Sequence, residues 1–135
     1  MVEIRVLYEG ELHTRCRHGP SGSELETDAP KDNEGRGERF SPTDLLATSL
    51  GSCMLTTMGI LARRRGWPLE GARVRVEKHM LTEPERRVGR LVVAFELPAL
   101  PGDARPLLER AANACPVKRS LHPDVAVDVS FRWGA

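Results

Sequence analysis

The sequence predicts an α+β domain in which two helices pack on an antiparallel or mixed β-sheet. Short stretches in both halves of the chain alternate apolar with polar side chains, as half-buried strands do. A long run of small and apolar residues follows Ser41 and Pro42, and residues 103–114 place apolar side chains at helical spacing. The expected order is β-β-β-α-β-β-α-β within one domain that spans residues 1–135.

The first three strands are expected near the N-terminus. Residues 2–8 alternate most regularly, and residues 11–17 and 23–28 are weaker strand candidates. Residues 18–22 contain two glycines and a proline, which indicates a hairpin turn. The charged, glycine-containing stretch at 29–40 predicts an exposed loop that could border a site.

Helix signals appear at the end of this loop. Ser41 can cap a helix, Pro42 suits a first turn, and Asp44 favours the positive end of the helix dipole. The arginines at 63–65 suit the negative end, and Gly66 is a stop signal. We therefore expect one long helix between these signals.

The middle of this helix is small or apolar on nearly every face. A surface helix would keep one polar side, so we expect this helix inside the molecule or at an interface. Gly51 lies in the same stretch and would permit close packing.

The C-terminal half supplies the remaining elements. A charged turn at 83–86 separates two alternating segments and predicts a long hairpin. Pro116 forces a break or a restart after the second helix. The expected strands cover residues 72–81, 88–97 and 125–133, and the expected helix covers residues 103–114.

Composition excludes several classes of protein. The 20 basic and 19 acidic side chains leave a formal charge of +1, which calls for neither a nucleic-acid nor a membrane partner. Residues 1–10 carry charges where a signal peptide needs an apolar stretch, and we expect no run that approaches the length of a transmembrane helix. We expect a cytoplasmic protein with reduced thiols.

Two of the three cysteines have settings that could serve function. Cys53 lies in mid-helix, where a small residue could equally fill the core. Cys115 precedes Pro116, and a helix starting there would favour a thiolate through its unpaired N–H groups. Position alone does not decide, for either cysteine, between a core residue and a reactive thiol.

The other candidate ligands indicate no function by themselves. Cys16 lies on a predicted strand whose alternation directs Arg15 and Arg17 to the opposite face, so we interpret it as structural. The histidines show no ligand spacing such as HxxxH, and surface roles are favoured over metal binding. They are His13, His18, His79 and His122.

Two motifs together resemble the OsmC/Ohr family: SPTDLLATSLGSC, which ends at Cys53, and ACPVKRSL, which starts at Ala114. The resemblance covers nearly the whole chain in element order. It implies an interlocked homodimer with active sites at the subunit interface, and a peroxidase that uses no metal or organic cofactor. Cys53 matches the cysteine that attacks an organic hydroperoxide, and Cys115 matches the cysteine that resolves the resulting sulfenic acid. A dithiol reductant, such as a lipoyl-type group, would close the cycle.

The family also uses an arginine and an acid to activate the first cysteine. Arg17, in the Arg-x-Gly context of residues 17–19, is the best match, and Arg15 and Arg39 are alternatives. The family glutamate position is occupied by Thr43. The neighbouring Asp44 matches the acidic position of a branch similar to YhfA, so this pair could be shifted or absent.

Two other functions fit the same residues. A non-catalytic binder of small, lipid-like molecules would keep the apolar pocket and a slow thiol. A redox sensor would form the disulfide without turnover. Measured substrate turnover separates both from a peroxidase.

Overall fold

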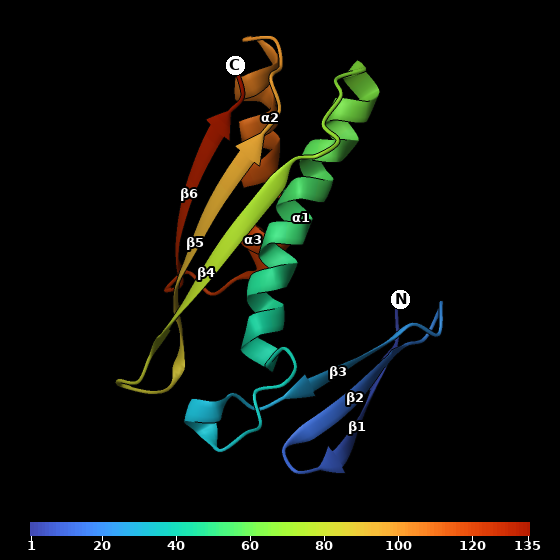
Figure 1. Ribbon diagram of the computed structural model, residues 1–135, viewed down its shortest axis with the longest axis vertical. Coiled ribbons are helices and arrows are strands. Elements are labelled where there is room, and N and C mark those ends of the chain that lie inside the picture. Colours follow the sequence, from blue (N-terminus) through green and yellow to red (C-terminus); the bar gives the residue numbers. More distant parts are fainter. The chain divides into compact units, whose positions relative to one another are not determined.

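The computed structural model describes all residues, 1–135, and the chain divides into two compact units. The N-terminal unit covers residues 1–46 and the C-terminal unit covers residues 47–135. Figure 1 shows the elements of each unit in sequence colours. Their bounds are β1 Ile4–Gly10, β2 His13–His18, β3 Glu24–Asp28, the 3₁₀ turn η1 Lys31–Asn33, α1 Pro42–Arg65, β4 Arg73–Leu81, β5 Arg87–Leu97, α2 Ala104–Asn113, α3 Pro116–Ser120 and β6 Ala126–Trp133.

The N-terminal unit contains an antiparallel sheet with the order β1-β2-β3. The β1–β2 turn places Gly10, Glu11 and Leu12 at positive φ, a conformation that costs little only for glycine. The predicted turn at 18–22 closes through hydrogen bonds from the His18 amide to the Ser23 carbonyl, and from the Gly22 amide to the His18 carbonyl. The three predicted strands are confirmed.

Strand β1 is an edge strand whose apolar side chains are exposed. Ile4, Val6, Leu7 and Tyr8 are each 61–63% exposed. Successive side chains of a strand point to opposite faces, so both faces of β1 present apolar surface. Exposed apolar edges of this kind are typical of surfaces that a partner covers.

Helix α1 begins and ends as the sequence signals indicate. The Asp44 amide donates to Ser41 Oγ at 3.1 Å, and the Ser41 amide donates to Asp44 Oδ2 at 2.9 Å, which is a reciprocal capping box. At the other end Gly66 has φ +72, and the Trp67 amide donates to the Ala62 carbonyl at 2.9 Å. This is a Schellman termination, and it needs glycine at the left-handed position.

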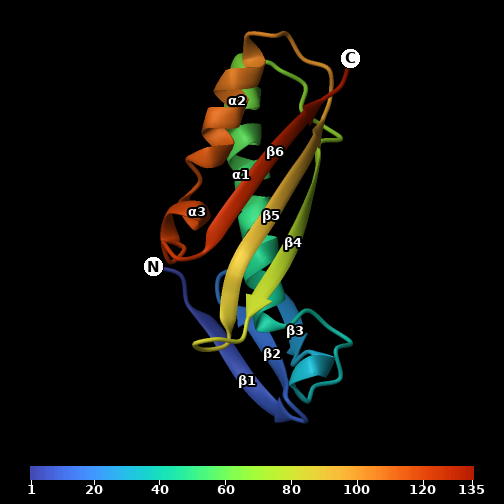
Figure 2. The same cartoon turned by 90° about the vertical axis from the view of Figure 1, so that its left-hand side faces the viewer.

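The C-terminal unit contains a sheet with the order β4-β5-β6. Strands β4 and β5 form the predicted antiparallel hairpin, whereas β5 and β6 run parallel. A parallel pair needs a crossover connection, and α2 and α3 supply it. Figure 2 shows α1 and α2 on the same face of this sheet.

The core of the C-terminal unit lies between this sheet and the helices. Phe95 and Phe131 are register partners on β5 and β6, and their rings stack with centroids 4.9 Å apart. A Cβ atom on Gly51 would lie 2.8 Å from Val76 Cγ2 and 3.2 Å from Val74 Cγ1. Such distances are too short for a side chain, so the predicted close packing at Gly51 is confirmed.

Helix α1 also corrects one expectation. It is 24 residues long and contains an 18-residue stretch with a mean hydropathy of 1.6, so by length and composition it could cross a membrane. The expectation that no run approaches that length was therefore wrong. A core helix passes the same test, and the fully buried Leu50, Met54 and Met58 give α1 this role.

The predicted fold class and element order are confirmed, with two additions. The structure divides the six strands between two three-stranded sheets, and it adds the short helix α3 directly after Cys115. The periodicity of side chains identifies strands, but it does not indicate which strands pair.

Candidate active site

Cys53 lies on α1 and is half-buried. Its side chain packs against the core of the C-terminal unit, and its carbonyl accepts a hydrogen bond from Thr57 Oγ1 at 2.8 Å. The helix therefore holds the backbone of Cys53 in place, and the residue keeps partial access to solvent. Partial access is what a thiol needs in order to meet a substrate.

Cys115 is the N-cap residue of α3 and is fully buried. Helix α2 ends at Asn113, and Pro116 starts α3, so the chain turns at Cys115 in an extended conformation. The Lys118 amide donates to Cys115 Sγ at 3.3 Å. The predicted helix start at Pro116 is confirmed, and it places a backbone donor on the sulfur.

The two cysteines interact, and this interaction affects the acidity of Cys115. Burial is the largest cause that raises the pKa of the Cys115 thiol, and the amide N–H of Lys118 opposes it. A hydrogen bond with the Cys53 thiol and repulsion from its charge raise the pKa further. The amides at the helix start lower the pKa of Cys115, as expected, but burial outweighs them, so the net pKa is raised.

This arrangement assigns different chemistry to the two sulfurs. Both cysteines are free thiols that lie within interaction range of each other. Cys53 is partly exposed, whereas Cys115 is fully buried. The raised pKa of Cys115 keeps its thiol protonated at neutral pH. A species formed on the Cys53 sulfur would therefore have the Cys115 thiol within interaction range.

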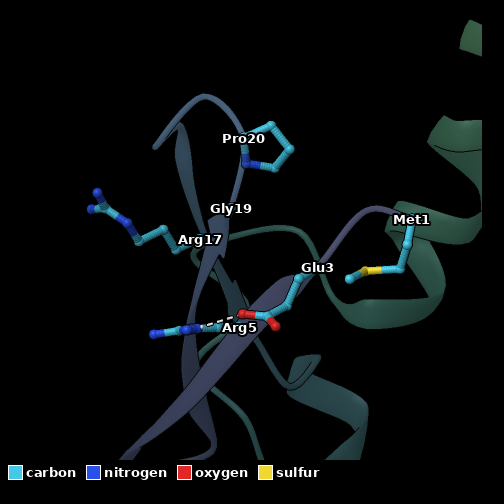
Figure 3. A pocket seen from close by; sticks show the side chains of 6 residues that line it. All are labelled: Met1, Glu3, Arg5, Arg17, Gly19 and Pro20. Atoms are coloured by element: carbon cyan, nitrogen blue, oxygen red, sulfur yellow. Dashed lines mark hydrogen bonds and ion pairs between the residues drawn. The ribbon is translucent and has the colours of Figure 1, made fainter.

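The other predicted site residues belong to the N-terminal unit. Arg17 lies on β2 directly opposite Arg5 on β1, and together with Glu3 they line a cavity of about 440 Å³. Figure 3 shows the guanidinium groups of Arg5 and Arg17 on the same side of the paired strands β1 and β2. Arg17 has one ion pair, a 3.9 Å contact with Glu24. Its role beside a thiol stays a prediction.

The two alternative arginines are more strongly engaged. Arg15 contacts Glu9 at 3.2 Å and Glu26 at 3.3 Å, and Arg39 contacts Glu26 at 3.5 Å. The third cysteine, Cys16, is half-buried on β2, the middle strand of the sheet, with its sulfur 3.8 Å from Thr14 Oγ1. This placement is compatible with its interpretation as structural.

Asp44 has a local partner that sequence reasoning missed. Its carboxylate accepts the Ser41 amide of the capping box, so part of its role is to start α1. The signal was present, because a serine followed three residues later by an acid is a helix-start pattern. The Lys118 amide, by contrast, is one of the N–H groups expected at the helix start after Cys115.

Residues 35–130 match the family described as OsmC-like protein. The chain belongs to the OsmC-like protein family. No curated protein sequence matches it.

Solved structures of OsmC-like proteins superpose on nearly the whole chain. A Psychrobacter arcticus protein, provisionally named as an osmotic stress induced and detoxification response protein, is 43% identical with a TM-score of 0.92, covering 98% of this chain and 96% of its own. An organic hydroperoxide resistance protein OsmC from Legionella pneumophila is 20% identical with a TM-score of 0.73, covering 97% and 96%. A Vibrio cholerae protein, provisionally named for organic hydroperoxide resistance and solved with captopril in one active site, is 21% identical with a TM-score of 0.71, covering 97% and 90%.

Proposed function

We propose that this OsmC-like protein is a thiol-dependent peroxidase that reduces organic hydroperoxides to alcohols. The observation that carries the proposal is the pairing of an accessible Cys53 with a buried, interacting Cys115. Relatives of the same fold are named for organic hydroperoxide resistance, which supports this substrate class.

In the first step, the Cys53 thiolate attacks the terminal oxygen of ROOH. The O–O bond breaks, the alcohol ROH leaves with a proton, and Cys53 becomes a sulfenic acid. In the second step, the Cys115 sulfur attacks the Cys53 sulfur, and the hydroxyl group leaves as water with the Cys115 proton. The two thiols have then supplied the two electrons that the peroxide gained.

The resulting disulfide must be reduced to start another cycle. A dithiol of the lipoyl type would attack one sulfur, form a mixed disulfide and release the protein thiols as its own disulfide forms. The half-buried Cys53 offers the more accessible sulfur for this attack, because Cys115 is fully buried. The cycle uses no metal and no organic cofactor.

Activation of Cys53 requires a cation or a hydrogen-bond donor. We assign this role to Arg17, because it has only a long ion pair with Glu24, whereas Arg15 and Arg39 make shorter ones. Asp44 would help to orient the cation. Separate alanine variants of the three arginines test the choice, and the Arg17 variant should show the largest loss of kcat/KM.

The proposal includes an interlocked homodimer in the cytoplasm, acting in the response to oxidative stress. The exposed apolar side chains of β1 support a second copy as the partner, because a monomer would leave them in water. On α1, Ile60 is 44% exposed and Ser52 and Thr56 are also exposed, which leaves a side of the helix available for a second copy.

Steady-state turnover of cumene hydroperoxide with a dithiol reductant tests the proposal. We expect Cys53→Ser to abolish turnover while its circular dichroism spectrum stays native. Cys16→Ser is the matched control, since it also removes one thiol, and it should keep full activity. Full activity in Cys53→Ser would refute the peroxidase assignment, and disulfide formation without turnover would favour a redox sensor.

A further inference from the structure

We propose that Glu9, His13 and Glu26 form a site for a divalent transition-metal ion of the zinc type on the sheet of the N-terminal unit. The three residues come from β1, β2 and β3, so one ion would join all three strands. The site uses no cysteine, and its test does not depend on peroxidase activity.

The donor atoms already have the spacing that a metal requires. His13 Nε2 lies 3.1 Å from Glu26 Oε1 and 3.5 Å from Glu9 Oε1, and all three donors lie within 4.8 Å of one another. A tetrahedral ion with ligands at about 2.1 Å has its donors about 3.4 Å apart. An ion could therefore enter with small side-chain adjustments.

Neighbouring groups orient each ligand from outside. Asp28 is 2% exposed, and its Oδ1 lies 2.6 Å from His13 Nδ1. When this nitrogen carries the proton, the lone pair of Nε2 faces the two glutamates. A carboxylate on the second ring nitrogen is the usual companion of a metal-bound histidine.

The arginines hold the outer oxygens of the two glutamates. Arg15 Nε lies 3.2 Å from Glu9 Oε2, and Arg39 Nε lies 3.5 Å from Glu26 Oε2. The inner Oε1 atoms therefore remain directed at His13, although Arg15 Nη2 also lies 3.3 Å from Glu26 Oε1. The carboxylates of Glu9, Glu26 and Asp28 all approach the His13 ring, so negative charge lies beside the position that a cation would take.

A proton is the competing occupant of His13 Nε2. The hydrogen bond with Asp28 is the largest cause that raises the pKa of His13, and Glu26 acts in the same direction. A metal must displace that proton, so binding is best measured at mildly alkaline pH. Without a metal, the same residues form an ion-pair cluster.

Titration of the intact protein with Co²⁺, followed by visible absorption, tests the site. We expect saturable one-to-one binding without a thiolate charge-transfer band, since that band would indicate the cysteines. Zn²⁺ should displace the cobalt and raise the melting temperature.

Variants localise the ion. His13→Gln and Glu9→Gln should abolish saturable binding. Asp28→Asn, which changes the group on His13 Nδ1 but no ligand atom, should weaken it about 10- to 100-fold. His79→Gln is the matched control, because His79 also contacts a glutamate, Glu77, at 3.3 Å but has no second carboxylate ligand in its group. Saturable binding that survives in His13→Gln, or no binding by the native protein, would overturn the proposal.

Discussion

Gly51 offers a quantitative test of how α1 is held against its sheet. In Gly51→Ala the new methyl group would lie 2.8 Å from Val76 Cγ2 and 3.2 Å from Val74 Cγ1. Valine side chains are stiff at χ1 and cannot turn aside cheaply. The helix must therefore move away from β4, and overpacking of this kind costs about 1–3 kcal/mol.

The intrinsic helix preference of alanine opposes this cost. Alanine is favoured over glycine inside a helix by about 1 kcal/mol. Gly59, on the same helix, has no atom within 4 Å of a new Cβ, so Gly59→Ala should receive the benefit alone. Both substitutions gain the same helix preference, which makes Gly59→Ala a matched control.

Urea unfolding of the two variants gives the comparison. We expect Gly51→Ala to be less stable than Gly59→Ala by about 1–3 kcal/mol, which is the overpacking cost alone. Cys53 follows Gly51 by two residues, so the displaced helix should also slow formation of the Cys53–Cys115 disulfide. Equal stabilisation by both substitutions would refute the close contact between α1 and β4.

Three further predictions concern the thiols and the start of α1. Cys115→Ser should still consume one equivalent of hydroperoxide, but its Cys53 sulfenic acid should persist and react with dimedone, because the resolving thiol is gone; rapid loss of that adduct would contradict the assignment. The raised pKa of Cys115 keeps this thiol neutral in the folded protein at pH values where an unfolded cysteine, with an ordinary value of 9.0, is ionised. Stability attributable to Cys115 should therefore be unaffected below pH 9 and fall above it, and urea unfolding should show this fall reduced in Cys115→Ser. Ser41→Ala removes the hydroxyl that accepts the Asp44 amide and should cost about 0.5–2 kcal/mol in thermal unfolding, whereas Ser130→Ala, at an exposed position on β6, should change stability little.

Local patterns predicted the elements of the fold well. Ser41, Asp44 and Gly66 are signals that act within a few residues, and the structure uses each of them at an end of α1. Local patterns do not predict strand pairing, because pairing depends on contacts between distant segments. The parallel pairing of β5 with β6 and the division into two sheets therefore had no signal in the sequence.

The candidate sites show the same difference between features that the local sequence predicts and features that depend on contacts between distant segments. The Cys-Pro sequence predicted that Cys115 would start a helix, but only the structure reveals the burial that raises its pKa. The histidines showed no ligand spacing, because the partners of His13 lie on neighbouring strands. Glu9 and Glu26 approach it through the β1–β2–β3 pairing, which a search for HxxxH patterns does not detect.

The central claim is that Cys53 and Cys115 form one redox couple. The most direct measurement mixes the fully reduced protein with one equivalent of cumene hydroperoxide and maps disulfides by mass spectrometry of the digested protein. We predict one equivalent of alcohol, the loss of two thiols, and a single linked peptide pair that joins Cys53 to Cys115. Consumption of the hydroperoxide with no such link, or with Cys16 in its place, would contradict the account.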